Sequence, residues 1–260
     1  MNNRIFAVMK KNRLQKSLEI FGIQAVMDAV REGKEFDKIF MEKGVNTGLA
    51  MDLRALLKAH SIMFKAVPVE KLNRLTHKEH EGVFAFVSPV NFYTIGDVLM
   101  KTFEEGKSPI FLMLDRITDV RNFGAITRTA EACGVNAIII PKIGGAQLNS
   151  DAMNTSTGAL MHIPICREQN LHHSLKYLKK SGLKVVACTE KSDTSLYDVP
   201  FLDPVVIVMG SEEDGISEDI LELADAKTCI PMFGKTESLN VSVATAVVLY
   251  EAIRQRQIEA

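Results

Sequence analysis

The sequence predicts an α/β fold in two parts, a small α/β unit that ends near residue 90 and a larger parallel-sheet unit from residue 109 onward. Two observations lead to this prediction. In the back part, short apolar runs alternate with segments of helical spacing, and the runs are apolar throughout. Strands have this pattern when helices cover both faces of a parallel sheet. In the first third, strand-like and helical segments also alternate, but they are fewer.

The small unit is assigned to residues 1–90, with residues 1–15 as an extension, and residues 91–108 are assigned to a linker that contains one helix. Helices are predicted for the segments GIQAVMDAVREG, which ends at a glycine, TGLAMDLRALLKAHS and VEKLNRLT. Strands are predicted for FDKIFM, FKAVPV and GVFAFVS. The alternation indicates a mixed α/β unit.

The larger unit is assigned to residues 109–260. Its predicted strands are IFLMLD, NAIIIP, HIPIC, LKVVAC, VVIVMG and KTCIP. Helical segments lie between them, and a final helix carries Val243, Val247, Tyr250 and Ile253 at helical spacing. In open parallel sheets, ligands bind beyond the carboxyl ends of the strands. Three polar, glycine-bearing segments leave strands at that edge, RITDVRNFGAITRTA, SEEDGIS and MFGKTESLNVS, and we expect them to converge.

Composition narrows the class of protein. The chain has 260 residues, 47% apolar and 24% charged, which is ordinary for a globular protein. Its formal net charge is −1, so nucleic acid could bind only at a local basic surface. A frayed N-terminus and a solvated helix face are the alternative interpretation of the basic residues. The densest basic groups are Lys10, Lys11, Arg13 and Lys16, followed by Lys71, Arg74 and Lys78.

The cysteines and the N-terminus indicate a cytoplasmic protein. The four cysteines are far apart and lie in apolar segments, which favours buried free thiols and a reducing compartment. The first residues have no apolar core of signal-peptide length, and no run approaches the length of a membrane span. The cysteines are Cys133, Cys166, Cys188 and Cys229.

Several common sites are not supported. There is no G-x-G-x-x-G fingerprint, and GSEEDG lacks the Gly-Lys-Ser/Thr ending of a phosphate-binding loop. No cysteine and histidine group has metal-ligand spacing, so no metal is expected. None of the three loops contains a histidine, which argues against Ser-His-Asp catalysis.

Polar residues in the three loops each have two interpretations. Asn122 fits a helix cap, and Arg128 lies in an otherwise apolar helix, where it either faces solvent or meets an anion. Glu212 follows a strand and could serve a helix start or a ligand. Thr236, Ser238, Asn240 and Ser242 crowd the entrance of the last helix, although capping needs only one or two of them.

Together, three segments resemble the three motifs of the SpoU/TrmH family of RNA ribose 2′-O-methyltransferases. They are NFGAITRTAEACGV, VIVMGSEEDGIS and IPMFGKTESLNVSVATAVVLYE, and the resemblance covers residues 109–256. The front segments FGIQAVMDAV and HEGVFAFV are similar to the L30e-like substrate-binding domain found before it in many members. With both parts present, the chain most resembles members that methylate a guanosine of 23S rRNA.

The resemblance implies S-adenosylmethionine as cofactor, an RNA substrate, a homodimer and a deep trefoil knot in the back part. It implies that cofactor is bound, largely through the backbone, at Gly210, Ile230 and Leu239. The polar residues that match the catalytic site of the family are Asn122, Arg128, Glu212, Ser238 and Asn240.

The chain departs from the family pattern at two positions. Arg121 stands where many members have proline, and Glu81 stands where close relatives usually carry glutamine. The first could alter the loop or add a phosphate contact, and the second concerns contacts of the front part with RNA. Three alternatives stay open: a tRNA enzyme of the same family, an RNA-binding protein without catalysis, and a nucleotide-dependent oxidoreductase, which the missing fingerprint disfavours.

Overall fold

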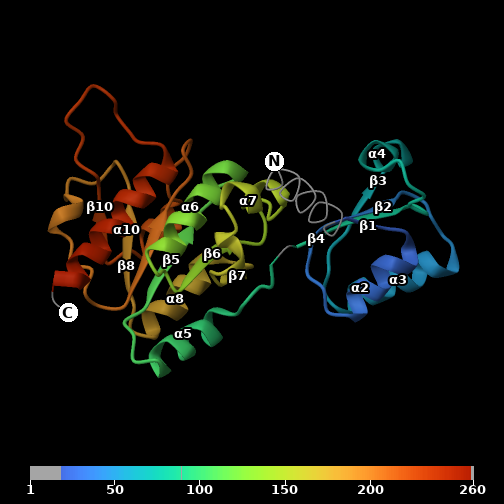
Figure 1. Ribbon diagram of the computed structural model, residues 1–260, viewed down its shortest axis with the longest axis horizontal. Coiled ribbons are helices and arrows are strands. Elements are labelled where there is room, and N and C mark those ends of the chain that lie inside the picture. The colour runs from blue at the N-terminus through green and yellow to red at the C-terminus, as the bar shows by residue number, and fades with distance from the viewer. Residues whose placement is uncertain (1–18, 89, 259–260) are drawn as a thin grey trace, which may run out of the picture. The chain divides into compact units, whose positions relative to one another are not determined.

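The computed structural model describes residues 19–88 and 90–258 (Figure 1). Contacts between Cα atoms divide the chain into two compact units. The front unit runs to Asn91 and includes residues 148–150, and the back unit comprises residues 92–147 and 151 onward. The basic group of Lys10, Lys11, Arg13 and Lys16 lies outside the described residues, so its interpretation as an RNA contact stays a prediction.

The front unit is built on a four-stranded sheet of order β1-β4-β2-β3. The β1–β4 and β4–β2 pairs are antiparallel, and β2 pairs with β3 in parallel. The three predicted strands and three predicted helices are confirmed, whereas the short edge strand β1 was not predicted. The elements are β1 (Glu19–Phe21), α2 (Ile23–Arg31), β2 (Phe36–Glu42), α3 (Gly48–Ala59), β3 (Lys65–Val67), α4 (Val69–Leu75) and β4 (Val83–Val87).

The two faces of the front sheet follow the alternation of its strands. Ile39 and Met41 of β2 point to one face and pack with residues of α2 and α3. Phe40, between them, points to the other face and packs with Leu72 of α4 and Phe84 of β4. Helices therefore cover both faces of this sheet.

The back unit is built on a six-stranded, fully parallel sheet of order β10-β8-β9-β5-β6-β7. All six predicted strands are present, although β7 and β10 each share only two residues with the predicted segments HIPIC and KTCIP. The strands are β5 (Ile110–Leu114), β6 (Ala137–Pro141), β7 (Ile165–Glu168), β8 (Lys184–Cys188), β9 (Val205–Met209) and β10 (Ala226–Thr228). The helices are α5 (Ile95–Glu104), α6 (Val120–Ala132), α7 (Ser150–Thr155), η1 (Ala159–Met161), α8 (Leu171–Lys180), η2 (Leu196–Asp198), α9 (Glu218–Leu221) and α10 (Val241–Ile258).

Both faces of the back sheet are buried, which explains why its strands are apolar throughout. Every residue of β5 and of β9 is buried. On one face, apolar residues of α5, α8 and α9 form a single core with alternate strand residues such as Phe111 and Met113. The helices α6 and α10 pack against each other beside the sheet (Figure 1). In the described part of the chain, no helix has the length and apolar character needed to cross a membrane.

The expected linker over residues 91–108 needs a correction. Its helix α5 is part of the back unit, because Ile95, Val98 and Leu99 are buried in the core that also contains Phe111. Three apolar residues at i, i+3 and i+4 form one face of a helix, and that face is covered by the sheet. A fragment that begins at Pro109 would lack α5 and would expose the part of the sheet that α5 covers.

The last helix also differs from the expected pattern. Val243 and Tyr250 are 50% and 59% exposed and Val247 and Ile253 are half-buried, so the apolar stripe found in the sequence is not fully covered in the single chain. The buried face is formed by other residues, among them Val248, Leu249 and Ala252. The helix is apolar on both sides.

Candidate functional site

A cavity of about 570 Å³ lies at the carboxyl ends of β8, β9 and β10. This is the edge at which ligands bind in open parallel sheets. Six of the eight cofactor and catalytic residues expected from the sequence line it: Gly210, Glu212, Ile230, Ser238, Leu239 and Asn240. The second and third polar loops therefore converge here, as the sequence predicted, while Asn122 and Arg128 of the first loop lie outside the wall of the cavity.

Three of the expected catalytic residues form one hydrogen-bonded cluster at this edge. The Nδ2 groups of Asn122 and Asn240 donate to Oε1 of Glu212 at 3.1 and 2.5 Å. Asn240 Nδ2 also lies 3.1 Å from Oδ1 of Asn122. The backbone N–H of Val241 donates to the same Glu212 oxygen at 3.2 Å. We call Asn122, Glu212 and Asn240 the polar cluster; it joins α6, the loop after β9 and the start of α10.

Asn240 serves both the cluster and the helix that follows it. Its Oδ1 accepts hydrogen bonds from the backbone N–H and the hydroxyl of Ser242, at 3.0 and 2.5 Å. An asparagine before a helix satisfies orphan N–H groups in this way. Its amide Nδ2 remains available to Glu212 and Asn122. Capping and cross-linking are thus performed by opposite ends of one side chain.

Asp119, rather than Asn122, caps helix α6. Its Oδ1 accepts from the backbone N–H groups of Arg121 and Asn122, both at 2.8 Å. The helix begins at Val120, so Asn122 lies in its first turn. The sequence interpretation of Asn122 as a cap is therefore wrong. Because Asp119 satisfies the helix start, the Asn122 side chain is available to the polar cluster.

Gly210 permits the tight turn that follows β9. A Cβ atom built there would lie 2.2 Å from the backbone carbon of Gly215, closer than real side chains come. Ser211 and Gly215 exchange two backbone hydrogen bonds of 3.1 Å across this turn. The turn lets Glu212 follow the strand directly and puts both Gly210 and Glu212 on the wall of the cavity.

Arg128 does not join the polar cluster. Its side chain is exposed, and within residues 19–88 and 90–258 it has no hydrogen bond or ion pair. The same holds for Arg121, seven residues earlier on α6. Seven residues are close to two helical turns, so the two guanidinium groups share one side of the helix. Ser238 is exposed and lines the cavity without a hydrogen bond to the cluster.

Sequence reasoning missed one wall of the cavity. Cys188, Thr189 and Glu190, at the end of β8, line it together with Leu196. This segment also leaves a strand at the carboxyl edge of the sheet. It is absent from the three predicted loops because it contains no glycine. Burial raises the pKa of the Cys188 thiol to about 12, so this cysteine is a neutral wall residue. All four cysteines are free thiols.

The lining of the cavity combines apolar and polar groups. Leu196, Met209, Ile230, Leu239 and Val248 supply apolar surface, while Glu190, Glu212, Ser238 and Asn240 supply acidic, hydroxyl and amide groups. Pockets of this volume with a few placed polar groups hold small molecules and cofactors. Among the described residues, no group of three or more histidine, cysteine or acidic side chains could hold a metal ion.

In the front unit, the departure at position 81 has a structural role. Oε2 of Glu81 accepts from the backbone N–H of Ile23 at 3.1 Å, at the first residue of α2. A carboxylate at a helix N-terminus is favoured by the helix dipole. Glu81 itself has a left-handed backbone with φ of 48°. The acidic residue therefore caps a helix in this chain.

Two family profiles match the sequence. The SpoU rRNA methylase family matches residues 109–250, and the family described as RNA 2′-O ribose methyltransferase substrate binding matches residues 20–93. The first match covers more than half of the chain.

Relatives and solved structures agree with these matches. The chain is 35% identical over 246 residues to the 23S rRNA (guanosine-2′-O-)-methyltransferase RlmB of Escherichia coli, covering 91% of this chain and 98% of the relative. It is 34% identical over 255 residues to the uncharacterized tRNA/rRNA methyltransferase slr0955 of Synechocystis, covering 95% of this chain and 65% of the relative.

The fold is shared with the SpoU methyltransferase AviRb from Streptomyces viridochromogenes, solved in complex with the cofactor AdoMet. The TM-score is 0.60 at 23% identity, and the match covers 97% of this chain and 98% of AviRb. This likeness confirms the predicted α/β fold. The chain belongs to the SpoU rRNA methylase family and is an RNA methyltransferase.

Proposed function

We propose that this protein transfers a methyl group from S-adenosylmethionine to a ribose 2′-hydroxyl of RNA, and that its substrate is a guanosine of 23S rRNA. The observation that carries the proposal is the polar cluster, because it brings residues of all three motifs to the carboxyl edge of the sheet, with Glu212 and Asn240 on the wall of the cavity. The 35% identity to the E. coli rRNA enzyme over nearly its whole length supports the rRNA substrate.

The cavity is the proposed site of the cofactor. Gly210, Ile230 and Leu239 hold it through backbone groups, and the apolar wall that includes Met209 and Val248 excludes water. S-adenosylmethionine supplies an electrophilic methyl group at its sulfonium; the C–O bond to the ribose forms as the C–S bond breaks. The protein's contribution is to hold the 2′-oxygen in line with that carbon, and orientation can be worth several kcal/mol, roughly 7–11 in favourable cases.

The polar cluster positions the reacting groups. Glu212 fixes Asn122 and Asn240 through one oxygen, and its other carboxylate oxygen, which has no hydrogen bond to any described residue, can accept one from a ligand. Ser238, exposed on the cavity wall, is placed to donate its hydroxyl to substrate or cofactor. These donors and acceptors are held by a parallel sheet and two helices. They need little rearrangement when charge develops on the ribose oxygen.

Arg128 is the proposed cation on the RNA side. An arginine is protonated at all ordinary pH values, so it is a poor base. A guanidinium with no partner among the described residues can instead bind an RNA phosphate and stabilise the developing alkoxide, and the phosphate can assist removal of the proton. Arg121 lies on the same side of α6 and is proposed to add a second phosphate contact.

The front unit is the proposed RNA-binding domain, L30e-like and assigned to residues 1–90. Support comes from one face of its sheet, where the ammonium groups of Lys71 and Lys78 lie 5.3 and 4.5 Å from the ring centres of Phe40 and Phe21. Exposed Arg74 lies on the same helix as Lys71. Cations beside aromatic rings suit a phosphate backbone and unstacked bases. Lys10, Lys11, Arg13 and Lys16, which lie outside the described residues, are further proposed RNA contacts.

The proposed enzyme is a cytoplasmic homodimer with a trefoil knot in its back unit. The outward apolar stripe of α10, with Val243 and Tyr250, supports a dimer contact. The segment between β10 and α10 supports the knot, because the backbone of Cys229 at its start donates a hydrogen bond to Thr194 and the side chain of Asn240 at its end donates one to Glu212. These partners lie on two separate loops.

A tRNA substrate is the second candidate, and the naming of the Synechocystis relative as a tRNA/rRNA methyltransferase favours keeping it. The test is to map ribose methylations in rRNA and tRNA from cells with and without the gene. We expect one guanosine methylation of 23S rRNA to disappear. Loss of a tRNA methylation instead would transfer the proposal to tRNA, and no change in either RNA would support a binding protein without catalysis.

A further inference from the structure

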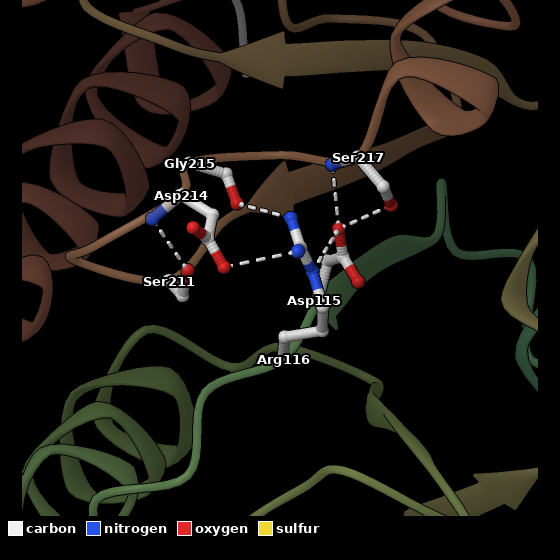
Figure 2. Close-up of polar contacts among 6 residues, drawn as sticks. All are labelled: Asp115, Arg116, Ser211, Asp214, Gly215 and Ser217. Atoms are coloured by element: carbon white, nitrogen blue, oxygen red, sulfur yellow. Dashed lines mark hydrogen bonds and ion pairs between the residues drawn. The ribbon is translucent and has the colours of Figure 1, made fainter.

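We propose that Asp115 and Arg116 are positioning residues for the methyl-transfer site, because this dipeptide fixes the loop that carries Glu212. Neither residue lines the cavity, and neither was singled out in the sequence. The inference rests on the proposed function for its consequence in cofactor binding. Its structural core is the network of contacts drawn in Figure 2.

Asp115 holds the far end of the loop. It directly follows β5, and its side chain is buried at 5% exposure. One oxygen, Oδ2, accepts from the backbone N–H of Ser217 at 2.7 Å and from its hydroxyl at 2.5 Å. Ser217 immediately precedes helix α9. The end of β5 is thereby tied to the point where the loop becomes a helix.

Arg116 holds the return of the loop. Its Nη1 lies 3.1 Å from Oδ2 of Asp214, and its Nη2 donates to the backbone carbonyl of Gly215 at 3.2 Å. Figure 2 shows the guanidinium between Asp214, Gly215 and the carboxylate of Asp115. Its Nε is buried, lies 3.5 Å from Asp115 Oδ2 and makes no hydrogen bond in the described part of the chain. It interacts with Asp115 as an ion pair.

The backbone of Arg116 is strained in a way that its side-chain contacts explain. Its φ is 57°, in the left-handed region that non-glycine residues avoid. Such a conformation costs free energy and persists only where surrounding interactions hold it. Here Arg116 is the second residue after β5, and its side chain points toward the loop after β9 rather than along its own chain (Figure 2).

The loop held in this way is part of the site. Ser211, Glu212, Glu213 and Gly215 line the cavity, and Glu212 is the acceptor that unites the polar cluster. Asp214 N donates to the Ser211 hydroxyl at 3.1 Å, so a hydrogen bond within the turn links its two sides. Fixing residues 214, 215 and 217 therefore fixes the carboxylate of Glu212.

The test removes the Arg116 side chain without disturbing its backbone. Arg116→Gly tolerates the left-handed φ, so the fold should be retained, while every side-chain contact is lost. We expect amide hydrogen exchange in residues 211–217 to rise by about tenfold or more, with the strands β5 and β9 unchanged. We also expect the dissociation constant of S-adenosylhomocysteine to rise by about tenfold, the size typical of coupled neighbours.

Two further variants make the test specific. Arg116→Lys keeps the charge opposite Asp214 but loses the fork that also reaches Gly215, so its effects should be intermediate. Lys184→Ala removes another ion pair of this unit, with Asp203 at 2.5 Å, at the opposite end of the strands. It should leave exchange in the loop and cofactor affinity within about twofold of wild type.

The outcomes separate the inference from the proposed function. Amide exchange is measured without ligand, so faster exchange in Arg116→Gly supports the positioning role whether or not the protein binds S-adenosylhomocysteine. Failure of the wild-type protein to bind S-adenosylhomocysteine would overturn the proposed cofactor site only. If the wild type binds and Arg116→Gly shows unchanged exchange and affinity, the positioning role is wrong. A uniform rise in exchange over the whole back unit would also overturn it, because it would show a general structural role.

Discussion

Asn122 and Asn240, 118 positions apart in the chain, lie side by side with Nδ2 of Asn240 3.1 Å from Oδ1 of Asn122, and both donate to Oε1 of Glu212. The shared acceptor couples them, since removal of either amide changes the hydrogen bonds that hold the other amide and Glu212 in place. We expect Asn122→Ala and Asn240→Ala to be non-additive in methylation rate, with a coupling of about 0.5–3 kcal/mol.

A double-mutant cycle of single-turnover rates would measure this coupling. Thermal melting should accompany it, because Asn240→Ala also removes the cap of α10, at a cost of about 1 kcal/mol. Strictly additive rates would mean that the two amides act independently of Glu212.

Arg128→Ala should abolish methylation of substrate RNA and leave cofactor affinity within a few-fold of wild type. The reason is that the exposed guanidinium lies outside the cavity wall and is assigned to the RNA. Calorimetry with S-adenosylhomocysteine and a methyl-transfer assay would separate the two effects. Arg121→Ala is the matched comparison on the same helix. It should weaken RNA binding and reduce the slope of log affinity against log salt concentration by about one, the value for one phosphate contact. A near wild-type rate for Arg128→Ala would refute its role.

Gly210→Ala should weaken cofactor binding more than any other single-methyl addition at the cavity. The added Cβ would lie 2.2 Å from the backbone of Gly215, so the turn must open and move Glu212. Gly144→Ala offers a control for glycine replacement in the same unit, since nothing lies within 4 Å of its Cβ position, although its φ of 83° makes some loss of stability expected. Calorimetry would measure the dissociation constant of S-adenosylhomocysteine for both variants under conditions in which both are folded to the same extent. Equal dissociation constants would contradict this expectation.

Glu251 should contribute to the free energy of unfolding at neutral pH, and this contribution should be lost in acid. Hydrogen bonding from Arg254, at 2.7 and 2.8 Å, lowers the pKa of this buried carboxyl below its ordinary value. A lowered folded-state pKa stabilises the protein above the unfolded-state pKa, about 4.3, and the contribution is lost as pH falls through the folded-state value. In denaturant unfolding, the difference between wild type and Glu251→Gln should be largest at neutral pH and shrink below about pH 4.3. A pH-independent difference would contradict this assignment.

Arg256→Ala should destabilise the back unit by about 1–3 kcal/mol, because it strips hydrogen bonds from several backbone carbonyls. Arg256 Nη1 donates to Ser108 O at 2.6 Å, Nη2 to Asp203 O at 2.6 Å, and Nε to Phe201 O at 2.8 Å. These carbonyls flank the starts of β5 and β9, so the arginine fastens the last helix to the sheet. Thermal unfolding would measure the loss; Arg254→Ala, on the same helix, removes only the Glu251 pair and serves as comparison.

Most of the fold was predictable because the burial of its strands is reflected in their amino-acid composition. Runs such as Ile110–Leu114 are buried on both faces, so each position is apolar and the run is easily recognised. The edge strand β1 escaped prediction because three half-exposed residues carry no such signal. The helix over Ile95–Glu104 was predicted but assigned to a linker, since its cover by the sheet is a tertiary contact that periodicity cannot identify.

The site was predictable where it follows from strand direction. Glu212 and Asn240 each lie beyond a strand of one parallel sheet, so their convergence could be expected before any coordinates. The identity of the α6 cap could not, because Asp119 and Asn122 are equally good caps by residue type. Asp115 and Arg116 were missed because their partners lie about 100 positions away, at 98 for Arg116–Asp214 and 102 for Asp115–Ser217.

The polar cluster has a consequence for biosynthesis. Its three residues come from α6, from the loop after the fifth strand of the sheet in chain order, and from the start of the last helix, and Ala244 and Val248 of that helix close the cavity. A growing chain therefore cannot complete the proposed cofactor site until residues as late as Val248 have been synthesised. Pairing in the sheet is also non-local, since β9 inserts between β8 and β5. Folding of such topologies is slow, so catalytic competence should appear as a late event with its own measurable lag.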